Sequence, residues 1–194
     1  MPEPIRTVLL VAPDLGLEFG QEELQDILRS GLDVTPLLGD VTQVELTREI
    51  ARGRYDALWL VTHGNADGIQ LGSRHITVMP VNAPPIPDLL DISALTALVR
   101  GRFQLVVLNS CASLAAAQML QNEAAVDVVC TIVDVPDLDA YRTGALFAHR
   151  LAETGDPRRA YAQSRPGNNR LYIYLAAVPD FLARRLTIPE TPAL

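Results

Sequence analysis

The chain has 194 residues, 48% of them hydrophobic, which is enough for one domain with a substantial buried core. All 16 basic residues are arginine, against 23 acidic residues, and the net charge of −7 is opposite in sign to the surface that nucleic-acid binding requires. No apolar run approaches the roughly 20 residues of a membrane span and no secretory signal is visible, so we expect a cytoplasmic protein with no nucleic-acid or membrane partner.

Apolar runs alternate with helical patterns through the first third of the chain. Residues 7–12, 33–38 and 57–62 predict strands, and the first of them is apolar throughout, which is typical of a strand buried on both faces of a parallel sheet. Residues 18–28 and 44–52 place apolar side chains three or four positions apart and predict helices.

The middle of the chain predicts a hairpin followed by a loop and a helix. Residues 69–71 and 76–78 are apolar and are separated by a short polar turn that begins with glycine. Residues 80–87 are rich in proline and predict a loop. Asp91 or Ser93 then caps a helix that runs to about residue 100.

The second half continues the alternation of strands and helices. Residues 103–108 and 126–133 predict buried strands, and residues 114–123 predict a helix between them. Residues 139–163 are helical in character, with a break at a Gly-Asp-Pro sequence, and residues 170–178 predict a last strand. Such alternation favours a three-layer α/β sandwich with a mostly parallel central sheet.

Reactive side chains follow two of the strongest strands. One strand ends in Thr62-His63-Gly64, and the other in Asn109-Ser110-Cys111. Sites in open parallel sheets form beyond the carboxyl ends of the strands, so neighbouring strands would place the imidazole and the thiol in one cleft.

This pair matches the needs of nucleophilic catalysis. A thiol benefits from a nearby base, and histidine titrates close to neutral pH. The oxyanion that forms after attack on an acyl carbon needs aimed donors. Gly64 allows a close backbone approach, and the N–H of Cys111, at the start of the predicted helix, supplies a second donor.

These motifs resemble those of the caspase-like (clan CD) cysteine peptidases, and most nearly the prokaryotic CHAT branch. A histidine-glycine pair ends one strand, and a serine-cysteine pair follows another, with Cys111 48 residues after His63. As an order of elements the resemblance spans residues 5–178. It implies a caspase-hemoglobinase-like fold for a domain at 1–186, and residues 187–194 read as a linker-like tail.

The resemblance implies a cysteine endopeptidase with a histidine–cysteine dyad. His63 is then the acid and base, Cys111 the nucleophile, and the backbone N–H groups of Gly64 and Cys111 the oxyanion hole. No carboxylate partner for His63, no cofactor and no metal are expected. The expected partners are a protein or peptide substrate and an activating partner or fused regulatory domains, as in a regulated effector of bacterial signalling or defence.

The surroundings of the cysteine differ from those in relatives of known preference. The caspase sequence Gln-Ala-Cys-Arg-Gly is absent, and Asn109 replaces the acidic residue that metacaspases place near the cysteine. The sequence therefore supports neither an acidic nor a basic cleavage preference. Asn109, Asp134 and Asp137 are candidates to line a substrate pocket, although both aspartates are also typical turn residues.

Two other functions remain open from the residues alone. A catalytically silent relative would use the same cleft to bind a peptide or partner. A flavodoxin-like or receiver-like domain is the third possibility, but no glycine-rich phosphate loop follows the first strand, where Asp14 is the single aspartate.

The remaining cysteine and histidines are expected to be structural. Cys130 lies inside an apolar strand and is typical of the core, while His75 falls in a predicted turn and His149 in a helix. Two cysteines do not make a zinc site, which needs about four clustered ligands.

Overall fold

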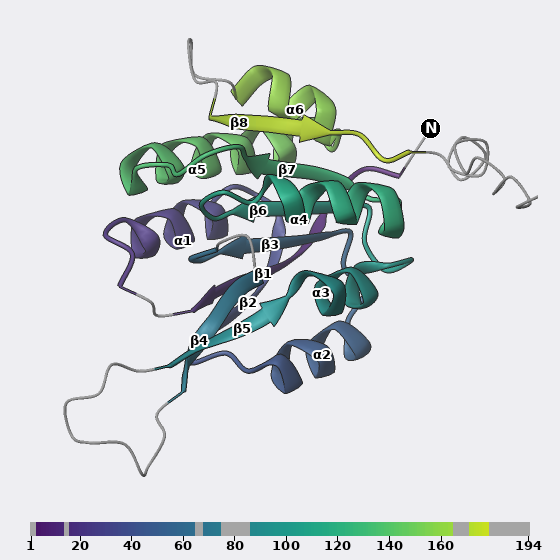
Figure 1. Cartoon of the computed structure of the whole chain (residues 1–194). Coiled ribbons are helices and arrows are strands. Elements are labelled where there is room, and N and C mark those ends of the chain that lie inside the picture. Colours follow the sequence, from purple (N-terminus) through teal and green to yellow (C-terminus); the bar gives the residue numbers. More distant parts are fainter. Residues whose placement is uncertain (1–2, 14–15, 65–67, 75–85, 165–170, 179–194) are drawn as a thin grey trace, which may run out of the picture.

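Six strands form one central sheet in the order β2-β1-β3-β6-β7-β8 (Figure 1). The computed structural model describes residues 3–13, 16–64, 68–74, 86–164 and 171–178. The strands are β1 (Thr7–Pro13), β2 (Asp33–Gly39), β3 (Ala57–Val61), β6 (Leu105–Asn109), β7 (Asp127–Thr131) and β8 (Tyr172–Leu175). All neighbours are parallel except β8, which runs antiparallel to β7. The predicted mostly parallel sheet is confirmed.

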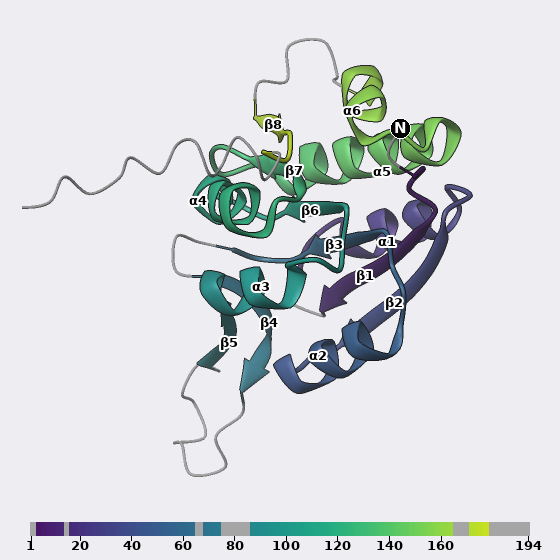
Figure 2. The same cartoon turned by 90° about the vertical axis from the view of Figure 1, so that its right-hand side faces the viewer.

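Helices cover both faces of this sheet (Figures 1 and 2). The helices are α1 (Gly20–Leu28), α2 (Gln43–Arg52), α3 (Ile92–Val99), α4 (Leu114–Met119), the π-helical turn η1 (Leu120–Ala124), α5 (Asp137–Thr154) and α6 (Pro157–Ser164). The buried residues of α2, α3 and α4 pack in one cluster, and those of α1, α5 and α6 in another. The three-layer sandwich is therefore also confirmed.

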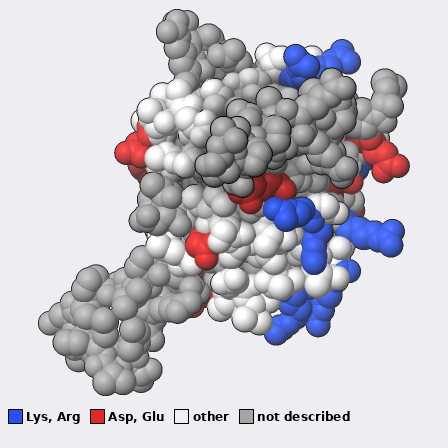
Figure 3. Space-filling model, turned by 45° about the vertical axis from the view of Figure 1, so that its right-hand side comes forward, with Lys and Arg blue, Asp and Glu red and all other residues white. Residues whose placement is uncertain are grey.

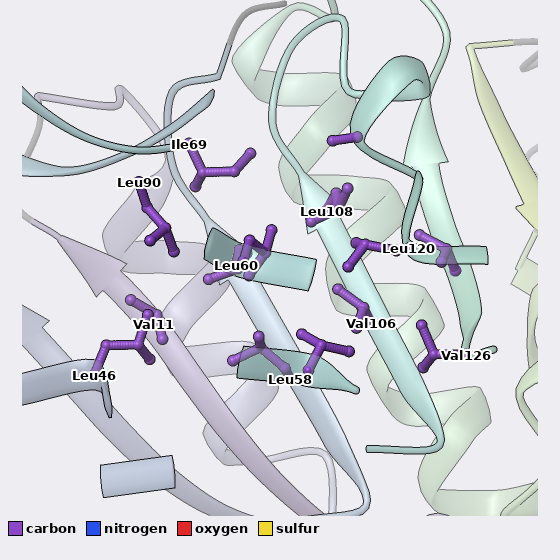
Figure 4. Packing of buried hydrophobic residues seen from close by; sticks show 14 of the residues in the cluster. Val11, Leu46, Leu58, Leu60, Ile69, Leu90, Val106, Leu108, Leu120 and Val126 are labelled. Carbon is purple, nitrogen blue, oxygen red and sulfur yellow. The ribbon is translucent and has the colours of Figure 1, made fainter. Parts of the chain in front are cut away.

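The two clusters follow from the two-residue period of the strands. In β3, Leu58 and Leu60 belong to the α2–α3–α4 cluster, while Trp59 belongs to the opposite one. Figure 4 shows the first cluster, in which Leu58 and Leu60 of β3 lie beside Val106 and Leu108 of the neighbouring strand β6. Because both faces of β3 and β6 are buried, these strands read as continuous apolar runs, which is why the sequence predicts them well.

Local signals set the helix ends. Thr42 forms a capping box with Glu45 at the start of α2, because its hydroxyl accepts the Glu45 N–H while the Glu45 carboxylate accepts the Thr42 N–H. At the end of α5, Gly155 adopts a left-handed conformation with φ of 64°. This glycine separates α5 from α6, as the predicted break requires.

The predicted hairpin is the main error. Strand β4 (Gly68–Arg74) pairs antiparallel with β5 (Ile86–Asp91), which the sequence assigns in part to the proline-rich loop. Residues 76–78, the expected partner strand, lie outside the described residues. Ile69 and Leu90 face each other in this ribbon and are buried in the core, so their burial sets the pairing.

Charge is scattered over the surface. On the face shown in Figure 3, basic side chains gather toward the right and lower right, and acidic side chains lie in several small groups, one of which adjoins a basic group. Within the described ranges, no helix combines the length and the apolar character that crossing a membrane would require.

Candidate active site

The ends of β3 and β6 meet at one pocket. The two strands are parallel neighbours, with Val61 opposite Asn109, and His63 and Cys111 each follow two residues later. Both side chains line a pocket of about 30 Å³, here called the strand-end pocket. Its lining also includes Glu23, Asn109, Ser110 and Asp137. The structure thus brings the predicted pair to one pocket, while their chemical roles stay predictions.

Gly64 allows the two strand ends to approach closely. A Cβ atom placed on Gly64 would lie 2.9 Å from the Ser110 Oγ and 3.4 Å from the Cys111 carbonyl oxygen. The turn is held by a 2.9 Å hydrogen bond from the Gln70 N–H to the His63 carbonyl. Only glycine fits here without displacing the segment that carries Cys111. The backbone of Gly64 therefore lies beside the predicted nucleophile, as its proposed oxyanion-hole role requires.

Cys111 lies in a tight turn after β6. The residue is half-buried, and its Sγ lies 3.8 Å from the Val135 carbonyl oxygen. The next residue, Ala112, has a φ of 48°, which is uncommon for a residue with a side chain. Its N–H donates to the Val133 carbonyl at 3.3 Å, so the loop after β7 holds the turn in this conformation.

The predicted helix start at the cysteine needs correction. Helix α4 begins at Leu114, so the Cys111 N–H belongs to the preceding turn and not to the first turn of the helix. The Ser113 side chain makes no capping hydrogen bond. It accepts instead from the Thr131 N–H at 3.1 Å, and the Thr131 Oγ1 donates to the Ser110 carbonyl at 2.5 Å. These bonds tie the cysteine turn to β7.

A buried carboxyl group lies in the same pocket. Glu23 of α1 is 2% exposed, and its Oε1 accepts a 2.6 Å hydrogen bond from the Asn109 Nδ2. Burial raises the pKa of Glu23 to about 8, since the charged form loses its water, and the nearby Asp137 acts in the same direction. The hydrogen bond from Asn109 opposes this rise in pKa. Glu23 is thus a titratable group next to the candidate nucleophile.

Gly144 of α5 leaves the space that Glu23 occupies. A Cβ atom on Gly144 would lie 2.1 Å from the Glu23 Oε1 and 3.1 Å from the Asn109 Nδ2. The helix therefore approaches the Glu23–Asn109 pair at the one position where it carries no side chain. This fit keeps the carboxyl group between α1, β6 and α5.

The three predicted substrate-pocket residues lie in different surroundings. Asn109 and Asp137 line the strand-end pocket, whereas Asp134 is exposed on the loop after β7 and does not line it. The Asp137 carboxylate accepts the Glu18 N–H at 2.9 Å and so joins α5 to the segment before α1. Contact of these residues with a substrate stays a prediction.

Sequence reasoning missed Glu23 and Tyr172. Glu23 lies four residues after Phe19 and four before Ile27, which places a charged residue on the apolar face of the helix. A charged residue at this spacing could have indicated a buried carboxyl group. The Tyr172 hydroxyl donates to the Asn109 Oδ1. Nothing in the local pattern of β8 distinguishes this tyrosine from one that merely packs against the sheet.

Cys130 and His149 do not line the strand-end pocket, and His75 lies outside the described residues. Cys130 is 0% exposed in β7, which confirms its predicted place in the core, and burial raises the pKa of its thiol to about 12. His149 is exposed on α5, and His75 lies outside the described residues. Among the described residues, no three side chains of histidine, cysteine, aspartate or glutamate cluster as metal ligands would.

Comparison with known proteins agrees with this arrangement. A protein-family model described as "CHAT domain" matches residues 12–129, a range that includes both His63 and Cys111. A secreted C11 cysteine protease from Bacteroides thetaiotaomicron, solved with an irreversible peptide inhibitor, superposes with a TM-score of 0.55 at 12% identity. The match covers 83% of this chain and 57% of that one, and it shows a shared fold. No curated protein matches the sequence.

Proposed function

Because the chain belongs to the CHAT domain family, whose model matches most of its length, we propose that it is a caspase-like cysteine endopeptidase. The observation that carries this proposal is the position of His63 and Cys111, which follow neighbouring parallel strands and line one pocket. The fold shared with a C11 cysteine protease supports it.

The proposed reaction is acyl transfer to Cys111 followed by hydrolysis. His63 takes the thiol proton, the sulfur attacks the carbonyl carbon, and the oxyanion receives the N–H groups of Gly64 and Cys111. His63 then gives its proton to the leaving amine. A water molecule, deprotonated by His63, attacks the thioester, and the carboxylic acid product leaves as the thiol regains its proton.

The wider role is proposed on the family alone. We infer a regulated effector domain of a bacterial signalling or defence system, switched on by an activating partner or by fused domains. The chain spans about 57% of the length of the C11 protease that it matches. Both cysteines are free thiols, which fits the reducing cytosol.

The alternative is a catalytically silent domain that binds a peptide or partner in the same pocket. The contact between the Cys111 Sγ and the Val135 carbonyl, at 3.8 Å, favours this alternative, because it directs the thiol toward the loop after β7. A peptidase must release this weak contact when the substrate enters.

Cleavage of a diverse peptide library tests the proposal. The wild type is compared with Cys111→Ala, with His63→Ala and with His149→Ala, which removes an exposed histidine on α5 and serves as the matched control. We expect cleavage by the wild type and the control alone. Cleavage that survives Cys111→Ala would contradict the assigned nucleophile, and a wild type that cuts nothing would favour the silent alternative.

A further inference from the structure

The direction of the Cys111 N–H determines whether this group can serve the proposed oxyanion hole. Helix α4 begins at Leu114, so the first turn of a helix does not orient the N–H. Within the described part of the chain no hydrogen bond uses it, which leaves it available to a substrate oxygen. The groups that orient it must therefore act on the peptide group between Ser110 and Cys111.

The order of the sheet sets the two directions in which this backbone can point. Strand β6 lies between β3 and β7 (Figure 1), and successive carbonyl groups along a strand point to opposite neighbours. The Asn109 carbonyl accepts the Thr62 N–H, which follows β3, at 3.4 Å. The Ser110 carbonyl comes next and points to β7, where it accepts the hydroxyl of Thr131.

This alternation turns the Cys111 N–H toward β3. The peptide bond between Ser110 and Cys111 is trans, so its N–H lies opposite to its carbonyl oxygen. A carbonyl held toward β7 therefore directs the N–H to the side of β3, the strand that Gly64 follows. The two backbone donors of the proposed oxyanion hole then lie on the same side of the cysteine turn.

Thr131 supplies a hydrogen bond that the backbone of β7 does not. The Gln104 carbonyl of the β6 segment accepts the Asp127 N–H at 3.1 Å, and the same register would give the Ser110 carbonyl the Val133 N–H. The pairing of β6 with β7 ends before that point. The Thr131 hydroxyl, at 2.5 Å, takes the place of the backbone donor.

The surroundings of Thr131 leave its hydroxyl proton one strong acceptor. Thr131 and Ser113 are each 1% exposed, so water does not compete for these groups. A carbonyl oxygen only accepts, so the single hydroxyl proton of Thr131 goes to Ser110. The Ser113 Oγ accepts the Thr131 N–H at 3.1 Å and lies 3.1 Å from the Thr131 Oγ1, to which it can donate. These bonds fix the direction of the Ser110 carbonyl.

We propose that Thr131 is a positioning residue for the oxyanion hole, because its hydroxyl holds the Ser110 carbonyl toward β7 and thereby aims the Cys111 N–H at the acyl oxygen. This inference rests on the proposed function for the reaction that uses the hole. Without the hydroxyl, the Ser110 carbonyl is buried with no donor, and rotation of its peptide group toward another donor turns the N–H out of the hole. The thiol, whose proton goes to His63, does not depend on this hydroxyl.

Two reactions of the same thiol separate the N–H from the sulfur. In acylation by p-nitrophenyl acetate, the Cys111 sulfur attacks the ester carbonyl carbon, its proton passes to His63, and an oxyanion forms. p-Nitrophenolate then leaves, and the acetyl group stays on the sulfur. Alkylation by iodoacetamide displaces iodide from a saturated carbon and forms no oxyanion. On the full chain, the absorbance of p-nitrophenolate measures the first rate, and peptide mapping by mass spectrometry measures the second.

Thr131→Val keeps the shape of the side chain and removes its hydroxyl. We expect acylation of Cys111 to fall at least about tenfold, since loss of one oxyanion donor costs enzymes about 10²–10³ in rate, while alkylation changes less than about twofold. Thr131→Ser keeps the hydroxyl and should retain more than about a third of the wild-type acylation rate. If Thr131→Val does not fold, as judged by thermal unfolding, Thr131→Ala replaces it with the same expectation.

Thr96→Val is the matched control. It removes the hydroxyl of another buried threonine, which donates to the Ile92 carbonyl within α3 at 2.7 Å and does not line the strand-end pocket. Both rates should stay at their wild-type values in this variant.

The outcomes separate this inference from the proposed peptidase. Unchanged acylation in Thr131→Val would overturn it, as would acylation and alkylation that fall together, which would show a displaced cysteine turn. A wild type that is not acylated at Cys111 would also overturn it. Selective loss of acylation in a protein that cleaves no peptide would support this inference and count against the peptidase. Peptide cleavage at equal rates in the wild type and Thr131→Val would do the reverse.

Discussion

The two cysteines lie on neighbouring parts of one sheet, yet their surroundings differ. Cys130 lies within β7, where it pairs with Leu108 of β6 and Ile173 of β8 and is closed off from water. Cys111 lies two residues beyond the end of β6 and reaches a pocket. The interior of a parallel sheet is apolar on both faces, whereas polar groups gather where its strands end. Position along the strand therefore separates a packing residue from a candidate nucleophile.

The largest expected difference is between the reactivities of these thiols. We expect iodoacetamide at pH 7 to alkylate Cys111 at least about 1000-fold faster than Cys130 in the folded protein. Burial raises the pKa of Cys130 from 9.0 to about 12, which alone removes about a thousandfold of its thiolate. Peptide mapping by mass spectrometry over a time course measures both rates. Comparable rates would remove the distinction between the two regions.

The next expected effect concerns the stability contributed by Glu23, the buried carboxyl at the strand ends. Its folded pKa is raised from 4.5 to about 8, so between these pH values the unfolded state loses a proton that the folded state keeps. The wild type therefore loses stability as pH rises through this window, and Glu23→Gln does not. Relative to the wild type, the variant should gain on the order of 3–5 kcal/mol between pH 4.5 and 8.

Urea unfolding at several pH values checks this dependence. The same pocket is lined by Asp137 of α5, Tyr172 of β8, and His63 and Cys111 at the strand ends. The difference between the two proteins therefore reports the titration of Glu23 together with its coupling to these neighbours. Glu22→Gln, at an exposed site, should run parallel to the wild type. Parallel curves for the wild type and Glu23→Gln would show that Glu23 titrates as an ordinary surface residue.

Much of the fold and the pair itself could be predicted, and the reason is the same buried sheet. Continuous apolar runs mark β3 and β6, and the residues that follow them are His63 and Cys111. The β4–β5 pairing could not be predicted, because Gly72 and Ser73 resemble a turn and the burial of Leu90 is a tertiary effect. The helical spacing of Glu23 places it on the apolar face of α1, but its partner could not be predicted, because Glu23 meets Asn109 across 86 residues of sequence.

A smaller effect is expected where the two strand ends touch. Gly64→Ala would place a methyl group 2.9 Å from the Ser110 Oγ, so the His63 and Cys111 segments must move apart. We expect kcat/KM for peptide cleavage to fall about tenfold or more, because the reacting groups are displaced. Steady-state kinetics and thermal unfolding of the same variant distinguish a local displacement from general loss of fold. Unchanged kinetics would show that the close approach at Gly64 is not required.

The smallest effect should separate Asp134, in the loop after β7, from Asp137, the first residue of α5. Asp137 lines the pocket, whereas Asp134 is exposed and does not. We expect Asp137→Asn to weaken binding of a lysine peptide two- to fivefold, because a nearby negative charge is lost, and Asp134→Asn to change it less than twofold. Kd values at low and high salt measure both. The reverse order would place the substrate over the exposed loop instead of in the pocket.

The most direct test of the central claim, that His63 activates Cys111, is covalent labelling by a peptide acyloxymethyl ketone. Intact-mass spectrometry follows the labelling rate in the wild type, in His63→Ala and in the control His149→Ala. We predict a single adduct at Cys111, formed at least about 100-fold more slowly in His63→Ala and at the wild-type rate in the control. Equal rates in all three proteins, or an adduct elsewhere, would contradict the dyad.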